Sequence, residues 1–426
     1  MRIILFVLFL LTLSVSNSLS AGFGLGEFGG RAIGMGNAVT AQAYDASTLF
    51  YNPAGLGFLD GTQFYGGITI IDPSANFVGA APVFDDKVYY AEEQYFPPLG
   101  IFISHRFSEK ISVGIGLTNP FGLGLAWGDD FPGRAISKDV TLQSFYITPV
   151  LAYRLNENIA LSAGADLVYS TLNLQRNVII ANTPGVPGTG TEVGEVELDG
   201  NSKIGIGFTA GIMYQQEKFG LGLMYRHTVN NNIEDGTAEF TLYNDIGPKV
   251  TALAKGILQD QAVSTEIEYP NYFVAGVYYK ILPRLGMEVD YAWYGWQVFD
   301  ELSLKFDDAA LNQVIPENYE NVWQLRVGAH FEVNENFSLR AGYIYDKTPQ
   351  PVESVSPLLP DDTRNDYAIG IGYKTGKFRF DGGYMYVDIG ERSTLENGVG
   401  MNDNSFNGTY NSDADLFFFS LGYTLR

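Results

Sequence analysis

The chain has 426 residues, a formal net charge of -22, no cysteine and an aromatic content of 14%. This charge excludes nucleic acid as a partner, because phosphate binding needs clustered Lys and Arg side chains. The lack of cysteine fits a protein that crosses an oxidising compartment without needing disulfide bonds. A mean hydropathy of +0.00 suits a β-barrel, in which apolar and polar side chains alternate and cancel.

The start of the chain has the three parts of a secretory signal peptide. Arg2 gives the positive start, and residues 3–13 form an almost unbroken apolar run. Ser18 and Ser20 then place small side chains before a cleavage site. The run is too short for a transmembrane anchor, which needs about 20 residues. We therefore expect residues 1–20 to be removed.

The next segment does not have the pattern of a strand. Residues 21–60 are rich in Gly and Ala, and a short helix is predicted at 37–44. A barrel of the size predicted below has a lumen too wide for its own side chains to fill, so we expect this segment to sit inside it as a plug. The GxGxxG match at residues 24–29 is not a nucleotide site, because no strand precedes it and no βαβ unit follows. The barrel itself is expected to cover residues 61–426.

After the plug, apolar residues alternate with small or polar residues. The pattern is clearest at residues 111–117, 204–214, 285–293 and 325–333. Successive side chains on a strand point to opposite faces, so each stretch has one apolar face. A soluble β-sandwich would share this alternation. The second face, however, is mainly Gly, Ser and Thr, which favours the lining of a lumen.

The connections between the predicted strands alternate in length. Short ones lie at residues 108–110, 156–158, 215–218, 282–284, 334–336 and 375–377. Long ones lie at residues 72–98, 119–142, 176–201, 230–270, 300–320, 347–362 and 388–413. Short turns on the periplasmic side and long loops outside the cell are typical of outer-membrane barrels. The alternation predicts about 14 strands, the first near 62–71 and the last at 415–425.

The predicted fold class is therefore all-β: a transmembrane, antiparallel up-and-down β-barrel of about 14 strands with an N-terminal lumenal plug, or hatch. Closure removes every strand edge, and hydrocarbon does not tolerate edges. We expect the protein in the bacterial outer membrane, with both termini on the periplasmic side. Trp293 and Trp296 fit an interfacial aromatic girdle. The chain ends with Leu425-Arg426 and not with the aromatic residue that is common in such barrels.

Several motifs resemble the FadL-type outer-membrane transporters of long-chain fatty acids and hydrocarbons. The first is Asn52-Pro53-Ala54-Gly55-Leu56, preceded by Gly36-Asn37-Ala38 and Asp45-Ala46-Ser47. The others follow in that family's order: Asn119-Pro120-Phe121-Gly122-Leu123, Gly133-Arg134, residues 290–296 with Phe299, residues 339–343, and Leu359-Pro360-Asp361 with Arg364. The resemblance implies passive uptake of hydrophobic compounds without a cofactor. In that family the ligand passes from the outer loops to a lumenal pocket and, once the plug shifts, leaves sideways at a kinked third strand.

The resemblance also implies roles for particular residues. The gating turn of the plug would be Asn52, Pro53 and Ala54. The kink and lateral opening in the third strand would be Asn119, Pro120, Phe121 and Gly122. A proline at this place removes a hydrogen-bond donor from the ladder, which would interrupt strand pairing. The candidate ligand-binding residues are Phe23, Phe28, Arg134, Arg176, Val250, Leu253 and Ile257.

Two groups of these candidates have a second explanation. Residues 250–257 form an i, i+3, i+4, i+7 apolar stripe on a short helix, which would either line the outer groove or merely cover its own loop. Arg176 falls where the family places a basic residue for the ligand carboxylate, and Arg134, Arg226 and Arg340 are other candidates for a lumenal cation. Charged residues inside a membrane usually pair with each other, however, so a neighbouring acid is the commoner partner.

Enzymatic activity has little support in the sequence. The three histidines are scattered, there is no thiol or HExxH motif, and no Ser-His spacing suggests a catalytic pair. No catalytic residue, metal ligand or cofactor is therefore expected, and an outer-membrane hydrolase is a distant alternative. The acidic loop residues are expected to be solvated, with divalent-cation bridging to lipid headgroups as the alternative.

Two other functions compete with hydrophobic uptake. The main alternative is a general diffusion porin for small hydrophilic solutes, although a wet pore needs no hatch. The other is an adhesive barrel whose acidic loops bind a surface partner. The expected partners are hydrophobic small molecules, outer-membrane lipid and lipopolysaccharide, and the protein is expected to be a monomer. The sequence does not identify the ligand among fatty acids, alkanes and aromatic hydrocarbons.

Overall fold

The computed structural model describes residues 22–84, 86–181 and 190–425. The predicted signal peptide at residues 1–20 and the C-terminal Arg426 lie outside these ranges. Among the described residues, none of the helices combines the length and the apolar character needed to cross a bilayer.

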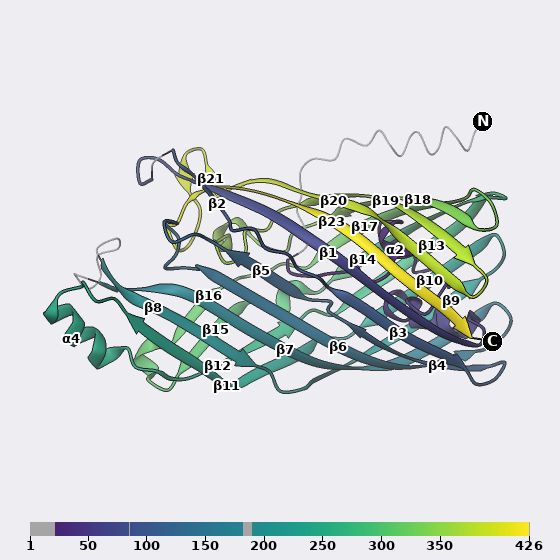
Figure 1. Cartoon of the computed structure of the whole chain (residues 1–426), viewed down its shortest axis with the longest axis horizontal. Helices are drawn as coiled ribbons and strands as arrows, with labels where there is room; N and C mark the ends of the chain where they lie inside the picture. The colour runs from purple at the N-terminus through teal and green to yellow at the C-terminus, as the bar shows by residue number, and fades with distance from the viewer. Residues whose placement is uncertain (1–21, 85, 182–189, 426) are drawn as a thin grey trace.

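Fourteen strands of the described chain form one closed antiparallel barrel (Figure 1). Eight strands are continuous: β1 (Thr62–Gly79), β3 (Leu99–Arg106), β6 (Asp139–Arg154), β7 (Ile159–Ala181), β18 (Phe337–Asp346), β19 (Arg364–Thr375), β20 (Phe378–Ser393) and β23 (Gly408–Leu425). The first of them pairs with the last, from Thr62 opposite Leu425 to Gly79 opposite Gly408. This seam closes the sheet on itself, as a membrane-spanning sheet requires.

The other six strands each consist of two segments. They are β4 and β5 (Ile111–Thr118, Gly122–Ala126), β8 and β9 (Gly190–Asn201, Gly205–Gln215), β10 and β11 (Phe219–Arg226, Val229–Leu242), β12 and β13 (Gln261–Tyr269, Tyr272–Leu282), β14 and β15 (Leu285–Tyr294, Glu301–Phe306), and β16 and β17 (Gln313–Pro316, Val322–Glu332). Shorter elements lie in the connections: β2 (Val88–Tyr90), β21 (Leu395–Glu396), β22 (Val399–Gly400), η2 (Trp296–Val298), η3 (Ala309–Leu311) and η4 (Val352–Ser354).

The predicted alternation of side chains is confirmed along the wall. On β9, Ile206 and Phe208 are exposed on the outer surface, whereas Gly207 and Thr209 between and beside them are buried. A belt of aromatic rings crosses the outer face of neighbouring strands; it consists of Phe273, Tyr291, Trp293, Trp323 and Tyr345. Such belts lie at the boundary between hydrocarbon and headgroups. The apolar outer surface of the wall is therefore the part that meets lipid.

The strands run further than predicted at one end of the barrel, which we call the long-loop end; the opposite end is the short-turn end. β1 continues to Gly79 and β7 to Ala181, so parts of several predicted long loops are strand. The reason is that the hydrogen-bond ladder continues where the outward side chains become polar, as at Asn232 on β11, which pairs with Glu266. The predicted helix in the loop at 230–270 is confirmed as α4 (Pro248–Ile257), which lies at the tip of the long-loop end (Figure 1).

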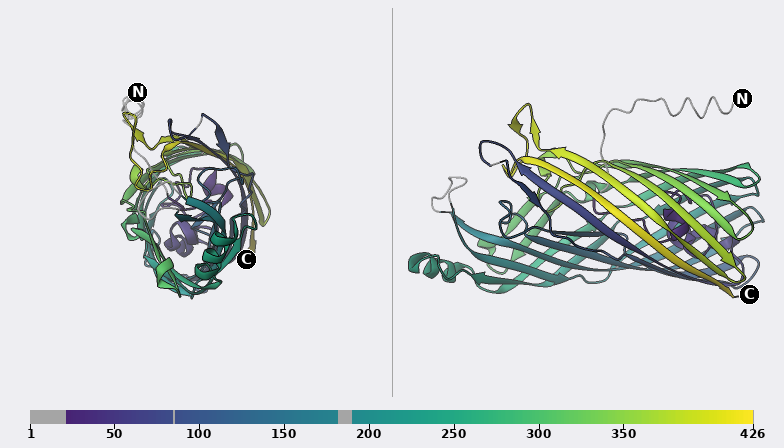
Figure 2. Two further views of the ribbon diagram at one scale, coloured as in Figure 1. Left: turned by 90° about the vertical axis from the view of Figure 1, so that its left-hand side faces the viewer. Right: turned by 45° about the horizontal axis from the view of Figure 1, so that its top comes forward.

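Residues 22–60 lie inside the barrel (Figure 2). They contain α2 (Gly30–Ile33), α3 (Thr48–Tyr51) and η1 (Pro53–Phe58). Their apolar side chains pack against residues of the wall in one cluster that includes Phe28, Leu49, Leu56, Tyr65, Phe102 and Val150. The approach is close: a Cβ on Gly342 of β18 would lie 1.9 Å from the Gly36 nitrogen, so no larger residue fits there.

The helix predicted at residues 37–44 is wrong. Asn37 has a φ of 56°, and the backbone N–H groups that a helix would use internally point at the wall. Val39 and Thr40 both donate to the Asp290 carboxylate of β14, and Ala41 donates to Glu288 on the same strand. Hydrogen bonds to these two carboxylates replace the intrahelical ladder.

Candidate functional site

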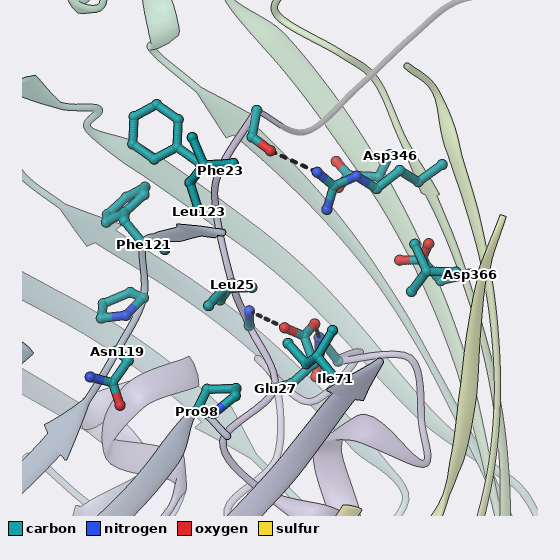
Figure 3. Close-up of a pocket in the computed structure, with 18 of the residues that line it drawn as sticks. Phe23, Leu25, Glu27, Ile71, Pro98, Asn119, Phe121, Leu123, Asp346 and Asp366 are labelled. Carbon is teal, nitrogen blue, oxygen red and sulfur yellow. Dashed lines mark hydrogen bonds between the residues drawn. The ribbon is translucent and has the colours of Figure 1, made fainter. Parts of the chain in front are cut away.

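A cavity of about 420 Å³ lies between the N-terminal segment and the barrel wall. One part of its lining is apolar, with Phe23, Leu25, Ile71, Pro98, Phe121 and Leu123 (Figure 3). The other part is polar, with Glu27, Arg326, Asp346, Arg364 and Asp366. A largely apolar cavity with a few polar groups at one side is typical of a small-molecule site.

The third strand of the barrel is interrupted beside this cavity, between β4 and β5. Pairing of β3 with β4 ends with Ile101 opposite Leu117. Two residues further on, the side chain of Asn119 takes the place of the ladder: its Oδ1 accepts from Leu99 N at 3.3 Å, and its Nδ2 donates to Ser144 O at 2.9 Å. Pro120 follows and has no N–H to donate.

The second and third strands meet again only near the long-loop end. There Ala91 lies opposite Trp127 in an isolated bridge, and Glu92 N donates to Ala126 O at 2.8 Å. In the described structure, residues 93–98 make no ladder with residues 120–125. The wall thus has a gap in its hydrogen bonding at the predicted kink.

The N-terminal segment pairs with the interrupted strand from within. Leu25 N donates to Pro120 O at 2.7 Å, and Gly122 N donates to Phe23 O at 3.0 Å. Gly24 and Phe121 form the bridge between these bonds. Residues 23–25 therefore act as a short extra strand on the inner face of the gap.

The same cavity reaches the outer face of the wall. Leu142 of β6 points into the lumen, whereas its neighbours Gln143 and Phe145 lie on the outward face, and all three line the cavity. On the outer side the ring of Phe96 lies over Gly124, where a Cβ would meet the ring at 2.0 Å. The cavity therefore passes between the second and third strands, and Phe96 covers part of its outer mouth.

The polar side of the cavity contains the guanidinium of Arg326, and the nearby carboxyl groups of Asp290 and Asp346 act on its charge. Arg326 is buried, and its side chain donates to the Gln324 side chain, to Tyr294 Oη at 2.9 Å and to Asn37 O at 3.4 Å. Asp366 also lines the cavity, and its Oδ1 has no hydrogen-bond partner among the described residues. Glu27 accepts from Gly26 N at 2.7 Å and from Asn37 Nδ2 at 3.2 Å, and burial raises the pKa of Glu27 above its ordinary value.

The first described residues are also held by the loop before β19. Gly22 N donates to Asp361 Oδ2 at 2.8 Å, and Arg364 donates to Gly22 O at 2.6 Å. Arg364 and Asp361 form an ion pair at 3.2 Å. Burial raises the pKa of Asp361 to about 6.

An aromatic cluster closes the cavity toward the long-loop end. The Phe23 ring packs edge to face on Trp296 and Phe299, with centroids 4.9 and 5.1 Å apart. Phe121 stacks on Tyr269 at 4.6 Å. This cluster joins the N-terminal segment, the interrupted third strand and the turn η2 between β14 and β15.

The rest of the N-terminal segment is anchored by buried polar groups. Asp290 Oδ2 accepts from Val39 N and Thr40 N, both at 3.1 Å, and Glu288 Oε1 accepts from Ala41 N at 2.5 Å. Asn52 Nδ2 donates to Thr40 O at 2.8 Å and to Ile212 O of β9 at 3.1 Å. The anchored part is thus bound through more and stronger acceptors than residues 23–25, which are held by backbone pairing and ring contacts.

The structure brings some of the predicted site residues together. Phe23 and all four residues of the predicted kink, Asn119 to Gly122, line the cavity. The predicted gating turn, Asn52, Pro53 and Ala54, begins η1 and contacts β9 through Asn52; it does not line this cavity. Phe28 lies in the packed core of the plug, edge to face on Phe50 at 4.7 Å.

Other predicted residues lie away from the cavity. Arg134 pairs with Glu192 at 2.9 Å, and Arg176 donates to Gln313 Oε1 at 2.6 Å. Val250, Leu253 and Ile257 are on α4, whose Ala254 packs on Val193 and Leu258, while Leu253 is 51% exposed. Arg226 and Arg340 pair with Asp166 and Asp381 respectively, in line with the alternative of structural ion pairs.

One aromatic residue is placed differently from the prediction. Trp293 belongs to the outer aromatic belt, as expected, but Trp296 is 1% exposed and lines the cavity. The break in β14 after Tyr294 turns the chain inward, and strict alternation does not predict such a break. Alternation does place Gln324 and Arg326 on the same face of β17 as buried Val322, so Arg326 could have been identified as lumenal from its register alone.

Comparisons with known proteins agree with this architecture. A family described as "Outer membrane protein transport protein (OMPP1/FadL/TodX)" matches residues 11–425. The long-chain fatty acid transport protein of Salmonella typhi is 25% identical over 379 residues, which cover 84% of this chain and 85% of that protein. The crystal structure of a Pseudomonas aeruginosa FadL homologue is similar at 21% identity, with a TM-score of 0.83 over 95% of this chain and all of that one.

A second solved structure has the same fold. The Ralstonia pickettii toluene transporter TbuX aligns at 16% identity, with a TM-score of 0.66 over 94% of this chain and 98% of that one. The closed barrel, the plug within it and the match along almost the whole sequence together identify the chain as a member of the outer membrane transport protein family OMPP1/FadL/TodX.

Proposed function

We propose that the protein carries hydrophobic compounds passively across the outer membrane, through the lumenal cavity and sideways out of the gap in the third strand. The observation that carries this proposal is the continuity of the cavity, which is lined by both lumen-facing and outward-facing residues of β6. Long loops outside the cell and termini in the periplasm are part of the proposal, as is typical of such barrels.

The substrate class follows from the lining. The relatives include a long-chain fatty acid transport protein and a toluene transporter, so both aliphatic and aromatic compounds are within the family's range. Each CH₂ group that leaves water for an apolar site gains about 0.8 kcal/mol. A cavity of about 420 Å³ with an apolar side therefore favours such molecules over hydrophilic solutes.

The polar side gives the cavity a place for a headgroup. Arg326 and Arg364 both line this side of the cavity, so a ligand carboxylate would meet two cations there. Hydrogen bonds to charged groups contribute about 1.5–3 kcal/mol. We therefore assign the ligand's polar end to Arg326 and its apolar part to the side formed by Leu25, Phe121 and Leu123.

The gate in this proposal is the short N-terminal strand. Residues 23–25 cover the gap from within and are held mainly by backbone pairing. The part of the plug around Asn52 is anchored on buried carboxylates and on the wall. Displacement of residues 23–25 alone would connect the lumen to the gap, while the anchored part keeps the lumen closed to bulk solutes.

Uptake measured in whole cells tests the proposal. Cells that lack their own transporters of this kind would express the protein and receive radiolabelled oleate or toluene at a low concentration. Faster uptake than in cells without the protein is expected, and equal uptake would overturn the proposal. A large, steady ion conductance in planar bilayers would favour the general porin instead.

A further inference from the structure

The barrel wall has a second interruption, between the eighth and ninth strands. Near the long-loop end Ser264 of β12 lies opposite Lys305 of β15, and toward the short-turn end Tyr272 of β13 lies opposite Tyr294 of β14. Between these pairs the ninth strand leaves the ladder and forms the turn η2, whose residue Trp296 points inward. All residues of this region belong to the described structure.

A second cavity, of about 430 Å³, occupies this interruption. Its lining includes Ile233 and Phe299, which are buried on the inner side, and Glu234, Glu266 and Ser303, which lie on the outer side. The cavity therefore reaches from the inner layer of the wall to its outer surface, as the first cavity does at the third strand.

The outer mouth lies at the level of lipid headgroups. On the same two strands, Phe273 and Trp293 belong to the outer aromatic belt, and the interruption begins directly beyond them toward the long-loop end. Aromatic belts mark the interface between hydrocarbon and headgroups. The mouth thus opens into the interfacial layer, where a polar lining is compatible with partial hydration.

The charged side chains at the outer opening of the second cavity disfavour the passage of anions. The cavity is lined by Glu234, Glu266, Glu268, Asp300 and Glu301, with Lys305 as the cation among its lining residues. Such a rim repels the phosphate and carboxylate groups of lipids and ionised fatty acids. An uncharged apolar compound, or a fatty acid in its protonated form, meets no such barrier.

Aromatic side chains connect the linings of the two cavities. Phe299 lines the second cavity, and Trp296 lines the first. The Phe23 ring packs on both side chains, with its centroid 5.1 Å from that of Phe299 and 4.9 Å from that of Trp296. These rings belong to the turn η2 and to the N-terminal strand that covers the third-strand gap. A molecule between Phe299 and Phe23 would lie next to the first cavity.

The direct path from the long-loop end is filled by packed side chains. Leu358, from the loop before β19, packs in one cluster with Leu302 and Leu304. Val355, from the same loop, packs in another with Phe77 and Trp127. At the interruption beside Phe299, by contrast, the second cavity provides open space.

We propose that the interruption between β12 and β15 is an entry opening, through which uncharged apolar compounds pass from the outer interface of the membrane, past Phe299, to the lumenal cavity. This inference rests on the proposed function and adds the route by which the substrate enters. The two openings then have separate roles, because the polar one beside Phe299 admits the substrate and the apolar one beside Pro120 releases it.

Crosslinking across the opening tests this route, and the native chain has no cysteine that would interfere. Glu266→Cys and Ser303→Cys would be combined in the full-length protein and joined with a bifunctional thiol reagent that reduction cleaves. Toluene uptake is expected to fall to the level of cells without the protein and to recover after reduction. Recovery shows that the barrel stayed folded.

The matched control joins the same two strands elsewhere. Val277 and Val289 are paired, lipid-facing residues of β13 and β14, and linking cysteines at these positions should leave uptake unchanged. Unchanged uptake after linking positions 266 and 303 would overturn the entry route. Equal uptake by uncrosslinked wild-type cells and cells without the protein would instead overturn the proposed function.

Discussion

Phe23 and Trp296 meet edge to face, with their ring centroids 4.9 Å apart and their planes at 70°. One ring belongs to the N-terminal strand, and the other belongs to the inward turn between β14 and β15. Because Phe23 also contacts Phe121 at 6.1 Å, a single side chain joins both interruptions of the wall.

Loss of this ring should loosen the gate. Aromatic pairs contribute about 0.5–1.5 kcal/mol each beyond the area they bury, so Phe23→Ala weakens the attachment of residues 23–25. Brief channel openings in planar bilayers are expected to become more frequent than in the wild type. Phe337→Ala, a change on the lipid-facing surface of β18, is the control. An unchanged opening frequency for Phe23→Ala would contradict the gating role.

The outer mouth of the third-strand gap should respond to changes at Phe96. Its ring covers Gly124, where any Cβ would meet the ring. Phe96→Ala removes the cover, and Gly124→Val forces the ring aside. Both changes are therefore expected to raise toluene uptake in cells at equal barrel expression, whereas a fall in uptake with both variants would refute the outer mouth as an exit.

The carboxylates of β14 should hold the plug in place. Glu288→Gln and Asp290→Asn each replace a carboxyl acceptor of plug N–H groups by an amide, which weakens this buried hydrogen bonding by about 1 kcal/mol. Amide hydrogen exchange at Val39, Thr40 and Ala41 is expected to accelerate about tenfold for each 1.4 kcal/mol lost, while exchange in the barrel strands stays slow. Glu332→Gln, an exposed change, serves as the control, and unchanged exchange would show that the anchor lies elsewhere.

Arg326 should distinguish a ligand with a carboxylate from one without. Arg326→Gln removes one of the two cations at the polar side of the cavity, so oleate uptake is expected to fall about tenfold, the equivalent of 1.4 kcal/mol, with toluene uptake unchanged. Arg176→Gln is the matched control, because Arg176 lies outside the cavity and bonds to Gln313. If Arg176→Gln were the variant that lost oleate uptake, the assignment from resemblance would be right and the one from geometry wrong.

Asp361, which accepts a hydrogen bond from Gly22, should make the stability of the protein dependent on pH. Burial raises the pKa of this carboxyl from 3.8 to about 6, so folding favours its protonated form. Its stabilising contribution is fully present below about pH 4 and is lost as the pH rises through 6, a difference on the order of 3 kcal/mol. The melting temperature in detergent should therefore be higher at pH 5 than at pH 8.

A variant that lacks a second buried acid, Glu317, separates the contribution of Asp361 to this pH dependence. Burial also raises the pKa of Glu317, to about 8, so the measurement would use Glu317→Gln protein with and without Asp361→Asn. The second change should reduce the remaining difference between pH 5 and pH 8. A difference that persists at full size would assign the pH dependence to other groups.

The barrel could be predicted from the sequence because its signal repeats along the whole chain. Alternation on β9 and β17, and short turns such as residues 334–336, each point to the same closed sheet. The extended long-loop ends could not be predicted in this way. There the outer face becomes polar while backbone pairing continues, as at Asn232, and a hydropathy pattern cannot separate such strands from loops.

The cavity was only partly predictable. Pro120 marks the gap because its missing N–H acts locally. Trp296 and Phe96 reach the site through tertiary contacts: one follows an inward turn, and the other depends on Gly124 of a neighbouring strand. The helix expected at 37–44 failed for a similar reason, because carboxylates distant in sequence take its N–H groups.

The seam between β1 and β23 has a consequence for biogenesis. Its two strands are the earliest and the latest of the wall in the order of synthesis, and they pair along the full 18 residues of each. The cylinder therefore cannot be sealed before the final strand exists, and residues 22–60 precede this closure in the order of synthesis. Closure of the seam is thus the last step in forming the wall around the leading segment.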